Sequence, residues 1–228
     1  MNYSFDFASL LPHWHAFLGG LWLTTQLSFS TTILGFVFGT LLAIGLDTRG
    51  WVAVPCRIYV ELIRNTPLLV QLFVVFFVFP SLGWKISAMS AAVIALGVNL
   101  AAYASEVIRA GIQSVHHGQI EAAECLGLNK AQIYWHVILM PAIEKVYPAL
   151  CGQFVLLMLA SSLTSQISVN ELTGIAGQIQ SETFRSFETY TVIAGLYLLL
   201  AFSMRLGLWL LGMLIFTRRR RLGSSISI

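Results

Sequence analysis

Five long stretches of this sequence carry few charges, and each is long enough to cross a lipid bilayer. A membrane helix needs about 20 mostly apolar residues to cross a hydrocarbon core of roughly 30 Å, because backbone groups without hydrogen bonds are too costly to leave in lipid. The stretches run over about 17–46, 54–79, 86–108, 134–163 and 190–216. We therefore expect an all-α, polytopic membrane protein with five transmembrane helices, forming a single domain over 1–228.

The composition excludes other classes of protein. Hydrophobic residues make up 57% of the 228 residues and charged residues 10%, whereas roughly a quarter of the residues in a soluble domain are charged. The formal charge is +3, but four of the 13 Lys and Arg residues form the block 218–221. A basic block beside an apolar stretch is typical of a membrane edge, so we expect contact with lipid and no nucleic-acid partner. The three cysteines lack zinc or redox spacing, and we expect no metal site.

The basic residues near or beyond the ends of the apolar stretches predict the orientation of the chain, because Lys and Arg are enriched in cytoplasmic loops. If the C-terminus is cytoplasmic, eight of these residues lie inside and two, Lys85 and Arg185, lie outside. The eight are Arg49, Arg57, Arg109, Lys130 and Arg218 to Arg221. We therefore expect the N-terminus outside and the C-terminus in the cytoplasm. The first stretch is expected to be a retained span, since residues 1–16 contain no Lys or Arg.

The predicted cytoplasmic loop 109–135 contains a segment, 119–126, with a strong tendency to form a helix. It has Glu and Ala inside it and a glycine on each side. The residues concerned are Gly118, Glu121, Ala122, Ala123, Glu124 and Gly127. The two alanines offer a low face on which another protein can pack, and the two glutamates offer carboxylates to basic groups. This composition is typical of a docking surface, although a solvated connector has the same composition.

The same loop has a motif of defined spacing. Glu121-Ala122-Ala123 is followed after three residues by Gly127, and nine residues separate Gly127 from Val137-Ile138-Leu139. The other distinctive segments are Tyr59 to Gln71, Ala102 to Ile112, Ser162 to Ile167 and Glu171-Leu172. Together they resemble the ABC importer permeases for polar amino acids, the histidine, glutamine and glutamate/aspartate group, and the loop resembles the EAA loop of that family. The resemblance covers nearly the whole chain.

The resemblance implies a type I ABC importer permease fold in the bacterial inner membrane. It also implies the partners: a second permease, two cytoplasmic ABC ATPases and a periplasmic or lipid-anchored amino acid binding protein. In such importers the EAA helix sits in a groove of the ATPase and passes its motion to the spans. That coupling role falls here to Glu121, Ala122, Ala123 and Gly127. This chain has no Gly-Lys dipeptide and hence no Walker A loop, so we expect the ATPase partner, and not this chain, to bind ATP and Mg²⁺ and to be the enzyme.

Two departures from the family pattern carry expectations of their own. Met140 stands where the family usually has proline, and Pro141 follows it, which predicts a helix interruption shifted by one residue. Leu159-Ala160 stands where many relatives have Lys-Asp, a pair suited to binding an amino acid near the bilayer midplane. A charged side chain is costly in lipid and is kept only where it has a function. The absence of the Lys-Asp pair is therefore informative about function. We therefore expect this subunit to lack half of a substrate site and to pair with a different permease that retains the charges.

Several polar residues within the spans are candidates for the translocation pathway. Glu61 and Arg64 are three residues apart, as are Glu106 and Arg109, so each pair can share one helix face. Such pairs either line a pathway or close the ends of spans as ordinary ion pairs. The candidate set is Glu61, Arg64, Asn99, Tyr103, Glu106, Ser161, Ser162 and Thr164. For the hydroxyl and amide side chains, helix packing is the competing interpretation.

Two further expectations concern packing and the outer surface. Gly35 and Gly39 have the spacing for close contact between helices. In the family, the outer side receives the binding protein, and the predicted external segment 165–189 has four charged residues that contact that protein or are merely solvated. They are Glu171, Glu182, Arg185 and Glu188.

Two other functions stay open on the residues alone. An ion-coupled secondary amino acid transporter or a channel would work without ATP. An intramembrane enzyme would need a nucleophile or a metal set at membrane depth, and the sequence has neither a His-Glu-x-x-His nor a Gly-x-Ser-x-Gly motif.

Overall fold

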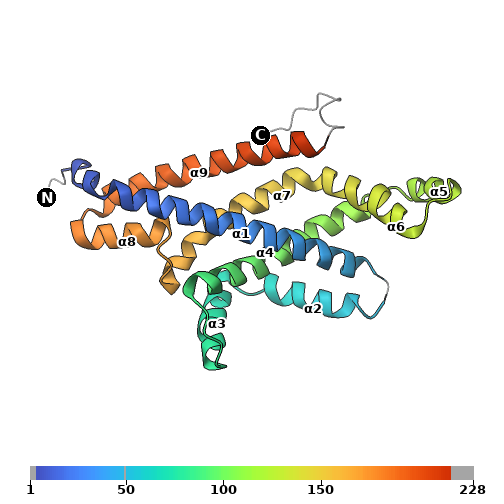
Figure 1. Cartoon of the computed structure of the whole chain (residues 1–228), viewed down its shortest axis with the longest axis horizontal. Helices are drawn as coiled ribbons and strands as arrows, with labels where there is room; N and C mark the ends of the chain where they lie inside the picture. The colour runs from blue at the N-terminus through green and yellow to red at the C-terminus, as the bar shows by residue number, and fades with distance from the viewer. Residues whose placement is uncertain (1–3, 49, 217–228) are drawn as a thin grey trace. The chain divides into compact units, whose positions relative to one another are not determined.

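The computed structural model describes residues 4–48 and 50–216, and every regular element in those ranges is a helix (Figure 1). Arg49 and Arg218 to Arg221, on which the predicted orientation partly depends, lie outside the described residues. The elements are η1 (Ala8–His13), α1 (Trp14–Asp47), α2 (Ala53–Arg64), α3 (Leu68–Ser81), α4 (Ala88–Gln113), α5 (His117–Cys125), α6 (Lys130–Gln132), η2 (Ile133–Leu139), α7 (Met140–Ala160), η3 (Ser161–Ile167), α8 (Leu172–Thr183) and α9 (Ser186–Ile215). Of the three η elements, η1 and η3 are 3-10 helices and η2 is a π-helix.

Four helical runs within the described residues are long and apolar enough to cross a membrane. They are Ala8–Asp47, Ala88–Gln113, Lys130–Ile167 and Ser186–Ile215. They correspond to the first, third, fourth and fifth predicted spans. The first and fourth extend beyond the expected bounds at both ends, whereas the third does so only at its C-terminal end and the fifth only at its N-terminal end. The fifth crossing is present if α2 and α3 together count as one span.

The predicted second span, 54–79, is therefore wrong as a continuous helix. It is broken between α2 and α3, at residues 65–67. Pro67 causes the break because it has no N–H to donate and because its ring disfavours helical backbone at the residue before it. Its own ψ of 137° is extended, and α3 begins at the next residue. Neither helix is long enough to cross alone, since 12 and 14 residues extend only about 18 and 21 Å.

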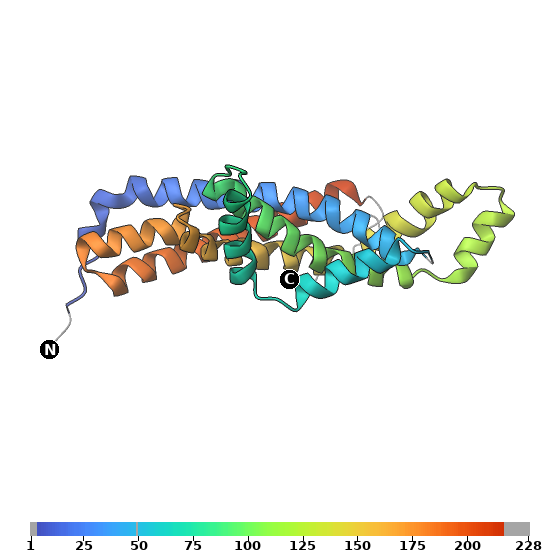
Figure 2. The same cartoon turned by 90° about the horizontal axis from the view of Figure 1, so that it is seen from below.

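The helices form two compact units, and the first comprises the described parts of Met1–Ile33, Thr66–Gly97 and Phe154–Leu206. In this unit α8 lies beside η1 and the first turns of α1 and α9 (Figures 1 and 2). The core that they share consists of Leu10, Phe17, Leu172, Ala176, Ile179 and Ile193. A Cβ added at Gly20 would lie 3.0 Å from the Cα of Leu172, so the missing side chain at Gly20 allows the backbones of α1 and α8 to approach closely.

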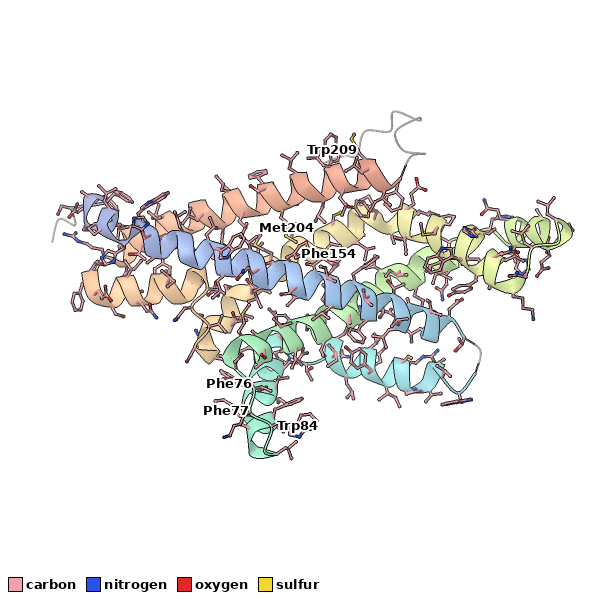
Figure 3. The ribbon with its side chains drawn as sticks, viewed as in Figure 1. Phe76, Phe77, Trp84, Phe154, Met204 and Trp209 are labelled. Carbon is pink, nitrogen blue, oxygen red and sulfur yellow. The ribbon has the colours of Figure 1, made fainter. Side chains whose placement is uncertain are left out.

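The first unit also contains α3, which packs against η3 and ends in a group of aromatic rings. Figure 3 shows Phe76 and Phe77 on α3 and Trp84 just after it. The rings of Phe76 and Phe77 are 5.1 Å apart, and those of Phe79 and Trp84 are 5.4 Å apart. Phe77 and Trp84 are exposed, as is typical of aromatic side chains at a membrane interface.

The second unit comprises the described parts of Leu34–Asn65, Val98–Gln153 and Gly207–Ile228. Here the second half of α1 packs against α4, and the contact depends on two glycines. A Cβ added at Gly35 would lie 2.6 Å from the Leu100 side chain, and one added at Gly39 would lie 2.9 Å from the Cβ of Ala104. The expectation that Gly35 and Gly39 serve close helix contact is confirmed.

Replacing Gly39 with leucine should destabilise the second unit. The new side chain would overlap Ala104 and the backbone of Ala101, and overpacking of this kind costs about 1–3 kcal/mol. We expect a lower Tm in detergent for Gly39→Leu. Gly19→Leu is the matched control on the same helix, because a Cβ at Gly19 has nothing within 4 Å. Equal Tm values for the two variants would contradict the packing role.

Candidate functional site

The loop that sequence predicts to be a docking surface forms the helix α5, in the second unit. Its first turn is capped by the imidazole of His116, whose Nδ1 accepts a hydrogen bond of 3.2 Å from the backbone N–H of Gly118. The helix therefore begins at His117, two residues earlier than the predicted start at 119, and Gly118 lies inside it. A side-chain acceptor at this position satisfies one of the free N–H groups of the first turn.

The other end of α5 is fixed by Gly127, whose φ of 75° lies in the left-handed region. This conformation allows the N–H of Gly127 to reach the carbonyl of Glu124 at 2.9 Å, and the N–H of Leu128 to reach the carbonyl of Ala123 at 3.2 Å. The pair of bonds is a Schellman motif, which favours glycine because a Cβ is strained at positive φ. The sequence predicted Gly127 only as the end of the helix. The structure shows that it also makes the hydrogen bonds of that end possible.

The two alanines of the EAA motif face different ways. Ala123 is the buried residue of α5, at 4% exposure, and α5 packs on η2. Ala122, Glu121 and Glu124 are exposed. The Nδ1 of His117 lies 3.1 Å from a carboxylate oxygen of Glu121 on that exposed side. Ala123 therefore anchors α5 to its own chain, while Ala122 and the two glutamates lie on its exposed side.

The segment behind α5 has a π-helical stretch, η2, between α6 and α7. The start of α6 is fixed by a capping box, in which the side chains of Asn129 and Gln132 each accept from the other's backbone N–H. At the far end Met140 donates to the carbonyl of Trp135, five residues back. Pro141 has no N–H to continue that pattern, and the chain goes on as the α-helix α7. The predicted interruption at Met140-Pro141 is thus a change from π to α geometry.

Two of the three ionic candidates for the pathway, Arg64 and Glu106, meet in the second unit, on α2 and α4. Glu106 receives two bonds from Arg109, at 3.0 and 2.9 Å, and lies 3.3 Å from Arg64. The guanidinium of Arg64 also lies 5.6 Å from the centre of the Tyr103 ring, within the range of a cation–π interaction. Two arginines and one carboxylate leave this cluster with a net charge of +1.

The arrangement differs from the predicted pairing in one respect. Glu106 and Arg109 form the expected pair, but Arg64 binds Glu106 and not Glu61. Glu61 instead accepts a bond of 3.1 Å from the side chain of Asn65. Asn99, on the same helix as Glu106, is buried at 9% exposure. The cluster therefore ties α2 to α4, and the bond of 2.7 Å from the Tyr59 hydroxyl to the carbonyl of Val98 does the same.

The hydroxyl candidates lie in the first unit, on η3. Each donates to the carbonyl three residues before it: Ser161 to Met158 at 2.6 Å, Ser162 to Leu159 at 2.8 Å and Thr164 to Ser161 at 2.7 Å. Ser161 and Thr164 are buried. Their hydrogens are thus used within the helix, and only the lone pairs of the oxygens are left to accept a bond from an amino group.

Glu171, placed by the sequence on the outer surface, is fully buried. It is the N-cap of α8, where it accepts bonds from the backbone N–H of Thr173 at 3.0 Å and of Gly174 at 2.9 Å. The hydroxyl of Tyr197, on α9, donates to it at 2.6 Å. The expectation that Glu171 contacts the binding protein is wrong, because the side chain is enclosed by its own chain.

Glu188 is corrected in the same way. It is also fully buried, and it accepts a bond of 2.9 Å from the backbone of Asp6 and lies 3.6 Å from Arg185. Of the four charged residues predicted to be external, Glu182 and Arg185 keep exposed atoms. An acidic residue before an apolar helix signals a cap, but no local signal links Glu171 to a tyrosine 26 residues away.

Burial raises the pKa of the Glu171 carboxyl, although the bonds from Tyr197 and from the backbone of Thr173 and Gly174 oppose the rise. The folded chain therefore holds this proton to a higher pH than the unfolded chain. The resulting stability is present below the ordinary glutamate pKa of about 4.3 and is lost as pH rises through the raised value.

We therefore expect Glu171→Gln, which imitates the protonated acid, to flatten the fall in Tm as pH is raised from 4 to 8. The control Glu182→Gln changes a mostly exposed carboxyl in the last turn of α8. It retains Glu171 and should keep the slope. A profile for Glu171→Gln as steep as that of the wild type would contradict this assignment.

Comparison of the sequence with known proteins indicates the family of this chain. The model of the family described as binding-protein-dependent transport system inner membrane component matches residues 35–215. A probable amino-acid ABC transporter permease of Sinorhizobium fredii is 39% identical over 194 residues, which cover 84% of this chain and 82% of that protein. The L-cystine transport system permease TcyB of Bacillus subtilis is 38% identical over 199 residues, with coverage of 85% and 83%.

A solved structure shows the same fold. The crystal structure of an amino acid ABC transporter with histidines has a TM-score of 0.84 and 36% identity, and the match covers 93% of this chain and 100% of that one. The match to the family model spans α5, the ion cluster on α2 and α4, η3 and α8. The chain therefore belongs to the family of binding-protein-dependent transport system inner membrane components.

Proposed function

We propose that this chain is the permease subunit of an ATP-driven ABC importer for polar amino acids and forms the translocation pathway with a second, different permease. The observation that carries the proposal is α5. It is a short exposed helix with one anchored alanine, two exposed carboxylates and a glycine-dependent end, in a chain of a binding-protein-dependent family. Such a helix fits the groove of a separate ATPase, which would bind ATP and Mg²⁺. The substrate class follows the relatives, which are named for amino acids and for L-cystine.

The orientation and the remaining partners belong to the same proposal. The N-terminus lies outside and the C-terminus in the cytoplasm, so that α5 faces the ATPases and α8 lies on the side that receives the binding protein. Motion of the ATPase would pass from α5 to η2 and α7, since α5 packs on η2 and η2 continues into α7. The alternative of an ion-coupled transporter or channel has no support from the family match and is not proposed.

The second permease is inferred from Leu159 and Ala160. Leu159 is 40% exposed and apolar, at the position where the resemblance to the polar amino acid permeases implies a charge. The hydroxyls of Ser161 and Ser162 donate to carbonyls at the end of α7, and η3 has no charged residue to bind a substrate. A site for a zwitterionic amino acid therefore needs charges from another subunit.

The test is to purify the tagged chain in mild detergent from its native membrane and to identify the proteins that come with it by mass spectrometry. An ATPase and a second permease are the expected companions. An ATPase with this permease alone would keep the importer and overturn the heterodimer. Recovery of no ATPase, under conditions that preserve a known ABC complex, would overturn the function.

Reversing the charge of Glu121 should reduce ATPase recovery and uptake together. The Glu121 side chain is 66% exposed and its contact is with His117, and a surface pair contributes only about 0–1 kcal/mol. The chain should therefore insert normally in Glu121→Lys, and the loss would report on docking. Glu121→Gln should be milder, because it removes the charge without reversing it. Wild-type ATPase recovery and uptake in Glu121→Lys would argue against α5 as the coupling helix.

A further inference from the structure

Arg205 is a charged residue within an apolar helix that the proposed function does not use. It lies in α9, which has 30 residues and whose most apolar window is 6% buried within this chain. The side chain of Arg205 is exposed. Among the residues that the structure describes, no carboxylate lies within 4.0 Å of its guanidinium, and the side chain makes no hydrogen bond.

The position of Arg205 along α9 is deep. It lies ten residues before Ile215, where the helix ends, and 19 residues after Ser186, where it begins. At 1.5 Å per residue these separations are about 15 Å and about 28 Å, against a hydrocarbon core of roughly 30 Å. Arginines near helix ends extend their charge to the headgroups. Arg205 does not lie at an end of the apolar stretch, because the exposed apolar surface of α9 continues past it to Leu210 and Leu214.

The exposed residues around Arg205 are large and apolar. Leu198, Phe202 and Leu206 are 59%, 61% and 57% exposed. This is the surface of a helix packed against protein or lipid tails, and not of one that lines a watery passage. Charged residues within membrane spans face a protein interior and pair with one another, because a guanidinium among lipid tails is strongly disfavoured.

We propose that Arg205 is the ionic contact of α9 with the second permease subunit, which presents a carboxylate to it within an apolar interface that includes Leu198, Phe202 and Leu206. The inference rests on the proposed function, because it needs a second permease beside this chain. Charge complementarity selects this occupant: the planar guanidinium is matched by a carboxylate, and only another membrane subunit can bring one to this depth. The ATPase and the binding protein act at the membrane surfaces.

The test compares Arg205→Met, Arg205→Lys and Arg205→Glu in the complex purified from native membranes, with the permease that accompanies the wild-type chain quantified by mass spectrometry. If the wild-type chain brings only a second copy of itself, two differently tagged copies serve as the probe. Lys85→Met, which removes an exposed cation outside the helices, is the control. Recovery of ATPase with the wild type tests the proposed function separately, before any variant is compared.

We expect recovery of the second permease to fall by roughly tenfold or more in Arg205→Met and further in Arg205→Glu, because the partner carboxylate is left unpaired. Arg205→Lys should keep most of it. Substituting lysine for one acidic residue within a span of the partner should restore assembly with Arg205→Glu and identify the contact. Wild-type assembly in all three variants would overturn the proposal in favour of a lipid-facing arginine. Intact assembly with a raised KM for the amino acid would overturn it in favour of a substrate contact.

Discussion

Replacing Gly127 with valine should reduce ATP-driven uptake by about tenfold or more while the chain still inserts in the membrane. The φ of Gly127 is 75°, a conformation that is strained for a β-branched residue and that costs an ordinary residue about 1–2 kcal/mol. Two bonds that end α5 depend on it, from Gly127 to Glu124 and from Leu128 to Ala123. A tenfold loss corresponds to about 1.4 kcal/mol, which is within the strain that valine introduces.

The matched control is Gly127→Asn, because asparagine tolerates the left-handed conformation. A Cβ at this position has nothing within 4 Å, so neither variant is excluded by a clash within the chain. Asparagine should therefore retain most of the uptake and of the ATPase recovery that valine loses. Wild-type uptake in both variants would show that the backbone geometry at Gly127 does not control coupling. Loss in both would point to a clash with the ATPase surface.

The helices of this chain could largely be predicted from sequence because lipid imposes one rule on every span. Any apolar stretch of sufficient length must satisfy its own backbone, and four of the five spans follow directly. The predicted second span is broken at Pro67 and is a crossing only if α2 and α3 count as one bent span. Pro67 is visible in the sequence as a signal for the break, since proline ends a helix and restricts the residue before it. Hydropathy alone does not take this effect into account.

The site was predictable where it depends on neighbours in the chain and not where it depends on contacts across it. The helix α5, its glycine end and the Glu106–Arg109 pair follow from local spacing. The ion pair between Arg64 and Glu106 joins α2 to α4. The burial of Glu171, before α8, depends on Tyr197 of α9. The burial of Ala123 likewise reflects packing of α5 on η2. Two identical residues, Ala122 and Ala123, differ in burial only because the fold covers one face of α5 and not the other.

A substituted homodimer should gain transport that the natural homodimer lacks. If Leu159 and Ala160 mark a missing half of the substrate site, this permease reconstituted with its ATPase and binding protein alone should show only background uptake. Introducing both charges, as Leu159→Lys with Ala160→Asp, should raise uptake above that background. Leu159 is 40% exposed, so the new lysine does not displace a packed side chain of its own subunit. Uptake of a radiolabelled amino acid into proteoliposomes, with and without ATP, is the measurement.

The charges carry a cost that the design of the experiment must separate from function. A lysine or an aspartate at the centre of a membrane helix is disfavoured by about 2.5–3.5 kcal/mol on insertion scales, so the amount of inserted chain must be measured for each variant. Leu159→Met with Ala160→Asn changes the same two positions without adding charge and should stay at background. Full uptake by the unsubstituted homodimer would remove the reason for a second permease. A gain in the charged variant alone would show that a pair of charges at the end of α7 is what the natural homodimer lacks, because only charge distinguishes the two substituted chains in kind.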